Sequence, residues 1–240
     1  EDLRISCGLF TKVNATVPRD RIQFISIHRP LLMRPLGLAA VRIETAGGGG
    51  NENEDASATV SRRWFVPVIS QQAAMDLLPI LRPQIAWDEA TMPWQGLSPL
   101  AGRRMFRQAI LMSLLAAAIG LLATRPWGFL AGLVVLPLGG LLARKKAQAR
   151  RYARTPWGLV FQSGILNRKL SFSFLDRLQT VDCGQSFFDR RWNMATLRVD
   201  TAAAGPANHL IDISYLDADF AVAEFYTLRA AAARERPAFG

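Results

Sequence analysis

The sequence predicts an α+β protein with membrane helices, in which two related β-rich domains flank a transmembrane helical hairpin. Three observations predict this fold class. A central stretch of the 240-residue chain is almost uncharged, cationic residues gather on both sides of it, and the two flanks resemble each other at a constant spacing. Half of the residues are hydrophobic although 20% are charged, which indicates that the two kinds are segregated along the chain.

The predicted organisation has five parts. They are a first β-rich domain (1–83), a linker (84–107), the helical hairpin (108–143), a basic juxtamembrane linker (144–156) and a second β-rich domain (157–235). The chain begins at Glu1 without a basic start or a short apolar core, so we expect no signal peptide and expect a downstream piece of a longer protein.

The first domain shows the alternation of apolar and polar residues that half-buried strands require, at 21–27 and 41–45. A further strand is expected at 58–66, after a glycine-rich acidic loop. A helical segment at 71–81 closes the domain. Gly8 lies where an early hairpin needs a permissive backbone.

The centre of the chain contains two apolar runs, 109–124 and 127–143, separated by Arg125 and Pro126. Each run is near the lower limit of length for a helix that crosses a bilayer. A proline, a charge and the aromatic Trp127 suit a turn at the far membrane surface. A buried helical pair in a soluble protein is the alternative, but neither flank offers the apolar shell that it would need.

Cationic residues lie directly outside both apolar runs, with no acidic residue among them. By the positive-inside rule, both ends of the hairpin and both flanking domains are expected in the cytoplasm. We also expect these side chains to contact anionic lipid head groups of the bilayer. The candidate head-group contacts are Arg103, Arg104, Arg107, Arg144, Lys145, Lys146, Arg150 and Arg151.

The second domain repeats the first at a spacing of 156 residues. Residues 8–46 align without gaps on 164–202 with nine identities in 39 pairs, several times the number expected by chance. Strands are predicted at 178–181, 197–201 and 209–213, and a helix at 217–234. Among the recurring polar residues, turn capping and inter-strand pairing are favoured over ligand contact. The recurring candidates are Asp20, Arg21, Gln23, Asp176, Arg177 and Gln179.

Three other classes of site find little support in the sequence. The net charge of +10 sits almost wholly in the two juxtamembrane clusters, which argues against a nucleic-acid surface. His28 and His209 do not occupy matching positions of the repeat, and neither joins Cys7 or Cys183 in a metal or triad pattern. We therefore expect no catalytic residue, no metal and no cofactor, and no enzyme.

The motifs of both copies resemble a known family. G-L-F-T-K, V-P-R-D-R-I-Q-F-I and V-R-I-E-T-A-G in the first copy, and L-D-R-L-Q-T-V and L-R-V-D-T-A in the second, are similar to the bacterial pleckstrin-homology-like domain of YdbS/YdbT-like membrane proteins. The resemblance implies two pleckstrin-homology-like β-barrels, each with a C-terminal helix. The second copy departs from the pattern at Arg191, Trp192 and Asn193, which puts any function of that loop in doubt.

The leading hypothesis is a non-enzymatic, membrane-anchored scaffold of the bacterial cytoplasmic (inner) membrane. It is multi-pass and binds anionic lipid head groups or protein partners, either a membrane protein or a second copy of itself. A role in envelope stress or membrane integrity is implied by resemblance alone. The alternative is a subunit of a transporter or channel, which Arg125 and Pro137 within the apolar region would favour.

Overall fold

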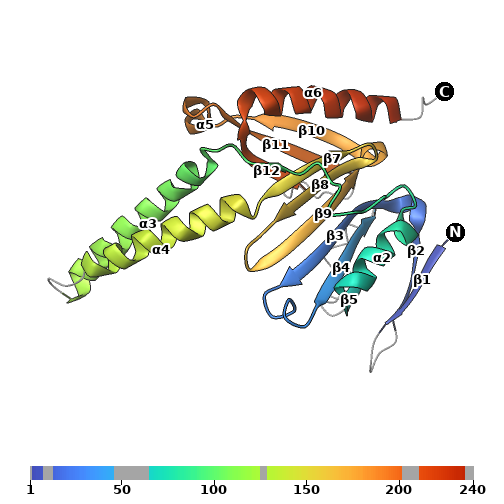
Figure 1. The fold of residues 1–240 in the computed structure, drawn as a ribbon, viewed down its shortest axis with the longest axis horizontal. Helices are drawn as coiled ribbons and strands as arrows, with labels where there is room; N and C mark the ends of the chain where they lie inside the picture. The colour runs from blue at the N-terminus through green and yellow to red at the C-terminus, as the bar shows by residue number, and fades with distance from the viewer. Residues whose placement is uncertain (1, 8–12, 46–64, 125–128, 202–210, 236–240) are drawn as a thin grey trace, which may run out of the picture.

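The protein is described here by a computed structural model that covers residues 2–7, 13–45, 65–124, 129–201 and 211–235. The described elements form a β-rich α+β body from which a pair of helices projects at one end (Figure 1). In chain order they are β1 (Asp2–Cys7), β2 (Val13–Pro18), η1 (Arg19–Arg21), β3 (Ile22–Pro30), β4 (Leu38–Thr45), β5 (Val66–Ser70), α2 (Gln71–Leu81), β6 (Gln95–Gly96), α3 (Ala101–Thr124), α4 (Phe129–Gln148), β7 (Arg151–Thr155), β8 (Gly158–Ser163), β9 (Asn167–Phe174), η2 (Leu175–Arg177), β10 (Leu178–Gly184), α5 (Phe187–Arg191), β11 (Met194–Thr201), β12 (Ile211–Asp217) and α6 (Ala218–Glu235).

One antiparallel sheet of seven strands contains strands from both copies of the repeat. Its order is β5-β4-β3-β9-β8-β7-β6, so β3 of the first copy pairs with β9 of the second. The register of this joint runs from Phe24 opposite Ser173 to Pro30 opposite Asn167. Backbone hydrogen bonding across this joint therefore unites strands of both predicted domains in one continuous sheet.

The remaining strands form two smaller sheets, β10-β11-β12 and the hairpin β1-β2. Most elements of the first copy have a counterpart 156 residues later in the chain. The pairs with identical spacing of their bounds are β1 and β8, η1 and η2, and β4 and β11. In the same order, β2 corresponds to β9, β3 to β10 and β5 to β12, and each copy closes with a helix, α2 or α6.

Two hydrophobic cores lie on opposite faces of the seven-stranded sheet. In the first, Ile25 and Val41 pack with Phe172 of the second copy and with Leu78 of α2. In the second, Phe24 of the first copy joins residues of β10, β11, β12 and α6. Because adjacent residues of β3 face different cores, each copy contributes side chains to the interior of the other.

The two closing helices are where the sequence pattern predicts them. Ser70 caps α2 by accepting from the backbone N–H of Ala73, and Asp217 caps α6 by accepting from those of Asp219 and Phe220. Gly164 forms the β8–β9 turn at φ +87, as predicted for an early hairpin. Its counterpart Gly8 lies outside the described residues, and so does most of the strand expected at 58–66.

The two segments expected to be linkers contain regular structure. In 144–156, the first residues continue α4 and the last ones form β7, which pairs with β6 and β8. In 84–107, β6 and the first turns of α3 are found. Before β6, Trp87 packs edge-on against Phe172 with ring centroids 5.3 Å apart, so this stretch covers the first core.

The helices α3 and α4 pack side by side as an antiparallel pair. Small residues allow this close approach, because a Cβ added to Gly132 or Gly139 would lie 2.7 Å or 2.6 Å from an alanine Cβ of α3. The hydroxyl of Ser113 donates to the carbonyl oxygen of Gly132 at 2.6 Å. The sequence predicted a transmembrane hairpin here: the two helices pack together, and within the described residues one of them, at Ala101–Leu122, is long and apolar enough to cross a membrane. The turn expected at Arg125 and Pro126 lies outside the described residues.

Candidate functional site

The base of the helical pair brings the two cationic clusters to one level. Gly140 of α4 faces Phe106 of α3, and this antiparallel register places Arg103 beside the end of α4 at Arg144. Four of the cations are exposed there, and Arg150 is half-buried after the end of α4. The exposed residues are Arg103, Arg144, Lys145 and Lys146, and we call them the basal cations. They are free of any ion pair among the described residues and can meet an anionic surface.

Two of the predicted cations instead hold α3 against the second domain. Arg104 lies 3.3 Å from the Asp189 carboxylate and 5.4 Å from the ring of Phe188. Arg107 lies over the same ring at 4.3 Å. Asp189 also completes a capping box with Ser186 at the start of α5. Sequence reasoning missed α5, although the S-x-x-D spacing before a basic pair is a capping signal.

A third predicted cation, Arg151, belongs to the sheet. Its guanidinium donates to Gln162 at 2.9 Å, pairs with Glu89 and stacks over Trp94 at 4.1 Å. These contacts anchor the segment before α3 to β7 and β8. Arg151 therefore fixes the place where the helical pair leaves the sheet, and a head group would have to displace Glu89 to reach it.

The recurring Asp-Arg pair has different surroundings in the two copies. In η2, Asp176 accepts a hydrogen bond at 3.3 Å from Arg82, the C-cap residue of α2, and forms an ion pair of 3.1 Å with Arg177, so it bridges the two copies. In η1, the corresponding Asp20 and Arg21 are exposed. The glutamines that recur in the two copies also differ: Gln23 is buried at the start of β3, whereas Gln179 borders a pocket beside β10.

Two arginines of the first copy reach into the second across the joint. Arg82 is 8% exposed, donates to the carbonyl oxygen of Ile22 at 3.2 Å and lies 4.5 Å above the ring of Phe174. Burial lowers the pKa of its guanidinium, and Asp176 acts in the opposite direction. Arg34 donates to the carbonyl oxygens of Ile165 and Leu166 in the β8–β9 turn. Sequence reasoning missed both roles, because nothing local marks them.

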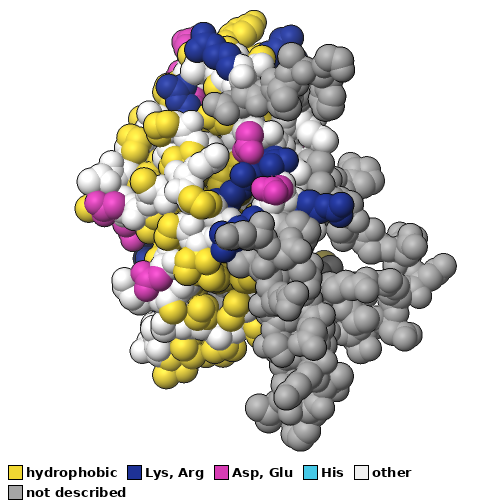
Figure 2. All heavy atoms as spheres, turned by 90° about the vertical axis from the view of Figure 1, so that its right-hand side faces the viewer, with side chains coloured by type: hydrophobic (Ala, Val, Ile, Leu, Met, Phe, Trp, Pro, Cys, Tyr) yellow, Lys and Arg dark blue, Asp and Glu magenta, His cyan; other side chains and the backbone are white. Residues whose placement is uncertain are grey.

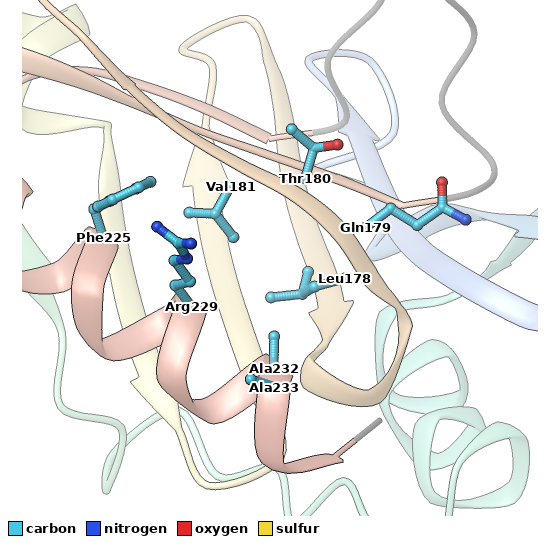
Figure 3. A pocket seen from close by; sticks show the side chains of 8 residues that line it. All are labelled: Leu178, Gln179, Thr180, Val181, Phe225, Arg229, Ala232 and Ala233. Carbon is cyan, nitrogen blue, oxygen red and sulfur yellow. The ribbon is translucent and has the colours of Figure 1, made fainter. Parts of the chain in front are cut away.

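A pocket of about 310 Å³ lies between β10 and α6. Leu178 and Val181 face the helix, and Phe225 and Arg229 of α6 face the strand (Figure 3). The small side chains of Ala232 and Ala233 leave room at the far end of the helix. The lining combines apolar side chains with the polar Gln179 and Thr180 and with one cation, Arg229.

Two potentially reactive side chains, His28 and Cys183, have surroundings that shift their pKa values. No group of three His, Cys, Asp or Glu side chains among them could hold a metal ion. His28 is kept neutral by burial, by Lys169 and by Arg42, which lower its pKa to about 4. Burial and Asp182 raise the pKa of the Cys183 thiol, so that it is a weak nucleophile at neutral pH.

The surface at the end opposite the helical pair carries charges of both signs. Figure 2 shows basic and acidic side chains next to each other at the centre of this face, with hydrophobic side chains below them. Where the structure describes this face, it has no broad patch of cations alone. A nucleic-acid backbone would require such a patch.

Comparison with known proteins identifies the repeated unit. Residues 1–82 and 109–230 match the family model described as "Bacterial PH domain". The chain is 27% identical over 229 residues to "UPF0699 transmembrane protein YdbT" of Bacillus subtilis (strain 168). That alignment covers 92% of this chain and 43% of the relative, so the chain spans less than half the length of the relative. No solved structure matches this chain.

Proposed function

This chain belongs to the bacterial PH domain family, and from this premise we propose that it is a non-enzymatic, membrane-anchored scaffold whose two cytoplasmic PH units lie against an anionic bilayer surface. In this proposal α3 and α4 both cross the bacterial inner membrane. The observation that carries the proposal is the exposed apolar surface of the helical pair next to the basal cations. The name of the Bacillus relative, a transmembrane protein, agrees with it.

Large apolar side chains of α3 and α4 are exposed, and their contact with water is energetically unfavourable. Leu122 is 84% exposed, and Leu114, Leu133 and Val134 are each more than 60% exposed. These side chains lie on both helices, and they face outward because Gly132, Gly139 and Ser113 lie where the two helices meet. Soluble proteins rarely expose a continuous apolar surface of this kind, whereas hydrocarbon stabilises it.

The shared sheet constrains how the pair enters the membrane. Residues on both sides of the helical pair hydrogen-bond directly to one another through β3 and β9, which supports a topology with both PH units on the same side of the bilayer. A chain that leaves and returns on one side crosses an even number of times. This supports a two-span hairpin, with the basal cations at the cytoplasmic surface as the positive-inside rule requires.

The basal cations supply the proposed lipid contact. Each Lys or Arg near an anionic leaflet contributes about 1 kcal/mol of attraction. Lys145 and Lys146 lie in the last turn of α4, at the level where the apolar surface ends. They would therefore hold the PH units close to the head groups, where partners at the membrane can be bound.

Topology is tested with single cysteines in a Cys7→Ser/Cys183→Ser background expressed in a bacterium. Gln72→Cys on α2 and Ala223→Cys on α6 lie at exposed positions of the two units. With a maleimide that does not cross membranes, both should be protected in intact cells and labelled after lysis, whereas Arg125→Cys should be labelled in intact cells. Labelling of only one PH unit in intact cells would refute the hairpin.

Head-group preference is tested by native mass spectrometry of the chain in micelles that contain phosphatidylglycerol and phosphatidylcholine. The Lys145→Gln/Lys146→Gln variant should lose its preference for the anionic lipid by up to about 30-fold, from two contributions of about 1 kcal/mol. The control variant Arg168→Gln/Arg234→Gln removes the same charge from exposed positions in β9 and α6 and should retain the preference. Equal loss in both variants would show that lipid preference depends on the net charge of the chain and not on the position of the basal cations.

A further inference from the structure

The strands that correspond to β3 and β9 in the other copy, β10 and β2, are not paired with each other. In the β3–β9 joint, which we call the occupied joint, β9 pairs with the edge of β3 that lies opposite β4. The counterpart of β3 in the second copy is β10, and the counterpart of β9 in the first copy is β2. Among the described strands, β10 is the outermost of its sheet and β2 pairs with β1 alone. The chain thus contains a counterpart of each strand of the joint: β10 corresponds to β3, which accepts a strand, and β2 corresponds to β9, which is accepted.

The two closing helices can be superposed residue by residue from their caps. Counting from Ser70 and from Asp217, Ala74 corresponds to Ala221 and Leu81 to Leu228, and all four side chains are fully buried. The next residues are Arg82 and Arg229. Because the helices are 147 residues apart while the strands are 156 apart, an alignment without gaps does not find this pair.

The pocket between β10 and α6 is the counterpart of an occupied site in the first copy. Its residues Leu178, Val181, Phe225 and Arg229 correspond to Ile22, Ile25, Leu78 and Arg82. In the first copy, Phe172 and Phe174 of β9 pack among these apolar residues. The carboxylate of Asp176, which follows β9, pairs with Arg82.

The arginines of the second copy differ from those of the first mainly in exposure. Arg82 is 8% exposed beneath its Asp176 and Phe174 contacts, whereas Arg229 is exposed at the mouth of the pocket (Figure 3). Arg34 holds the β8–β9 turn, whereas its counterpart Arg190 is exposed. The cations that hold the incoming strand in one copy are therefore present and accessible in the other.

We infer that the edge of β10 and the adjoining pocket bind β2 and η1 of a second copy of this chain. The segment that fits is identified by the repeat, since Asp20 and Arg21 of η1 repeat Asp176 and Arg177 of η2. Asp20 of the incoming chain pairs with Arg229, as Asp176 pairs with Arg82. This inference goes beyond the proposed membrane attachment and does not depend on lipid.

The occupied joint also fixes the register of the new one. Phe24 lies opposite Ser173 and Ile27 opposite Leu170, so their positions shifted by 156 place Thr180 opposite Val17 and Cys183 opposite Asn14. The contact is heterologous, because different surfaces of the two chains meet. Repetition of such a contact gives a head-to-tail row or a closed ring.

The register is tested by disulfide formation with the native Cys183. In a Cys7→Ser background, Asn14→Cys should form a disulfide with Cys183 of another chain under mild oxidation, because opposed Cα atoms in antiparallel strands lie at about 4.5–5.5 Å, within the range for a disulfide. Ala15→Cys is the control, since adjacent residues in a strand point to opposite faces. We expect at least about tenfold more linked dimer for Asn14→Cys, and its loss when Cys183→Ser is added.

A second measurement keeps the test independent of the new cysteine. Association of the wild-type chain in detergent micelles is followed by analytical ultracentrifugation over a dilution series. Asp20→Arg and Arg229→Asp should each weaken association about tenfold or more, and the double variant should restore it, as expected for a desolvated ion pair. A monomeric wild-type chain, or equal linking of Asn14→Cys and Ala15→Cys, would overturn the inference. Because the micelles contain no anionic lipid, such a failure leaves the proposed head-group contact unaffected.

Discussion

Arg82, which directly follows α2, and Asp176 of η2 form an ion pair of 3.3 Å although 94 residues separate them and they belong to different copies of the repeat. The arginine side chain is 9% exposed and that of the aspartate 27%. Since Arg82 also binds the carbonyl oxygen of Ile22 at the start of β3, this pair fastens the closing helix of one copy to the strand joint with the other.

Loss of the acidic partner should destabilise the whole body. In the Asp176→Asn variant, the buried guanidinium of Arg82 keeps its charge but loses its compensating carboxylate. Uncompensated buried charge typically costs about 3–5 kcal/mol, and partial exposure of Asp176 reduces this to about 2–3 kcal/mol. Chemical denaturation in micelles, with circular dichroism as the readout, measures the difference from wild type.

The matched control for this variant is Asp182→Asn. Asp182 lies 3.4 Å from Arg198, but its side chain is 54% exposed, and such surface pairs contribute at most about 1 kcal/mol. Similar losses for the two variants would contradict a special role of the Arg82–Asp176 pair in joining the copies.

The hairpin should depend on its glycines. A Gly132→Val substitution places a Cβ 2.7 Å from the Cβ of Ala117 and 2.8 Å from the carbonyl oxygen of Ser113, so α3 and α4 must move apart. We expect a lower midpoint of thermal unfolding of the helical signal in micelles. Gly102→Ala in α3 is the control, because nothing lies within 4 Å of the added Cβ, and it should be neutral or slightly stabilising.

The joint core should respond to truncation of Phe172. This side chain is fully buried at the β3–β9 joint and contacts Trp87 at 5.3 Å and Trp157 at 6.2 Å between ring centroids. Phe172→Ala should cost about 3–5 kcal/mol and shift the tryptophan emission to longer wavelength. In contrast, Phe187→Ala removes a ring that is 77% exposed, and its effect on the free energy of unfolding should be below about 1 kcal/mol. Equal effects would place Phe172 outside the core.

Local elements were predictable from the sequence because their signals are local. The helix expected at 71–81 has the same bounds in the structure, where its cap Ser70 and its apolar side Ala74, Leu78 and Leu81 act together. Even the strand β9, which the prediction omitted, carries a readable alternation of Leu170, Phe172 and Phe174 with serines. Period-two patterns of this kind depend on neighbours in the sequence alone.

The pairing partner of a strand could not be predicted in the same way. Both β3 and β10 offer β9 a similar edge, since they descend from the same pattern, and the sequence does not say which one receives it. The structure chooses β3, and Arg34 and Arg82 reinforce that choice from positions far along the chain. For the same reason the basic residues looked equivalent, although Arg104 and Arg151 hold protein segments and Lys145 and Lys146 face outward.

The joint should also make folding stability depend on pH through His28. Burial, Lys169 and Arg42 lower the pKa of this imidazole from 6.5 to about 4, so between these values the unfolded chain binds more protons than the folded one. Its contribution is therefore fully present above pH 6.5 and is lost as the pH falls towards 4. Chemical denaturation at pH 7.0, 6.0 and 5.0 should show stability falling with pH more steeply in wild type than in His28→Gln, whose side chain does not titrate. Subtracting the two curves removes the contributions of carboxylates and of His209, and parallel curves over this range would show that His28 accepts a proton in the folded state as easily as in the unfolded one.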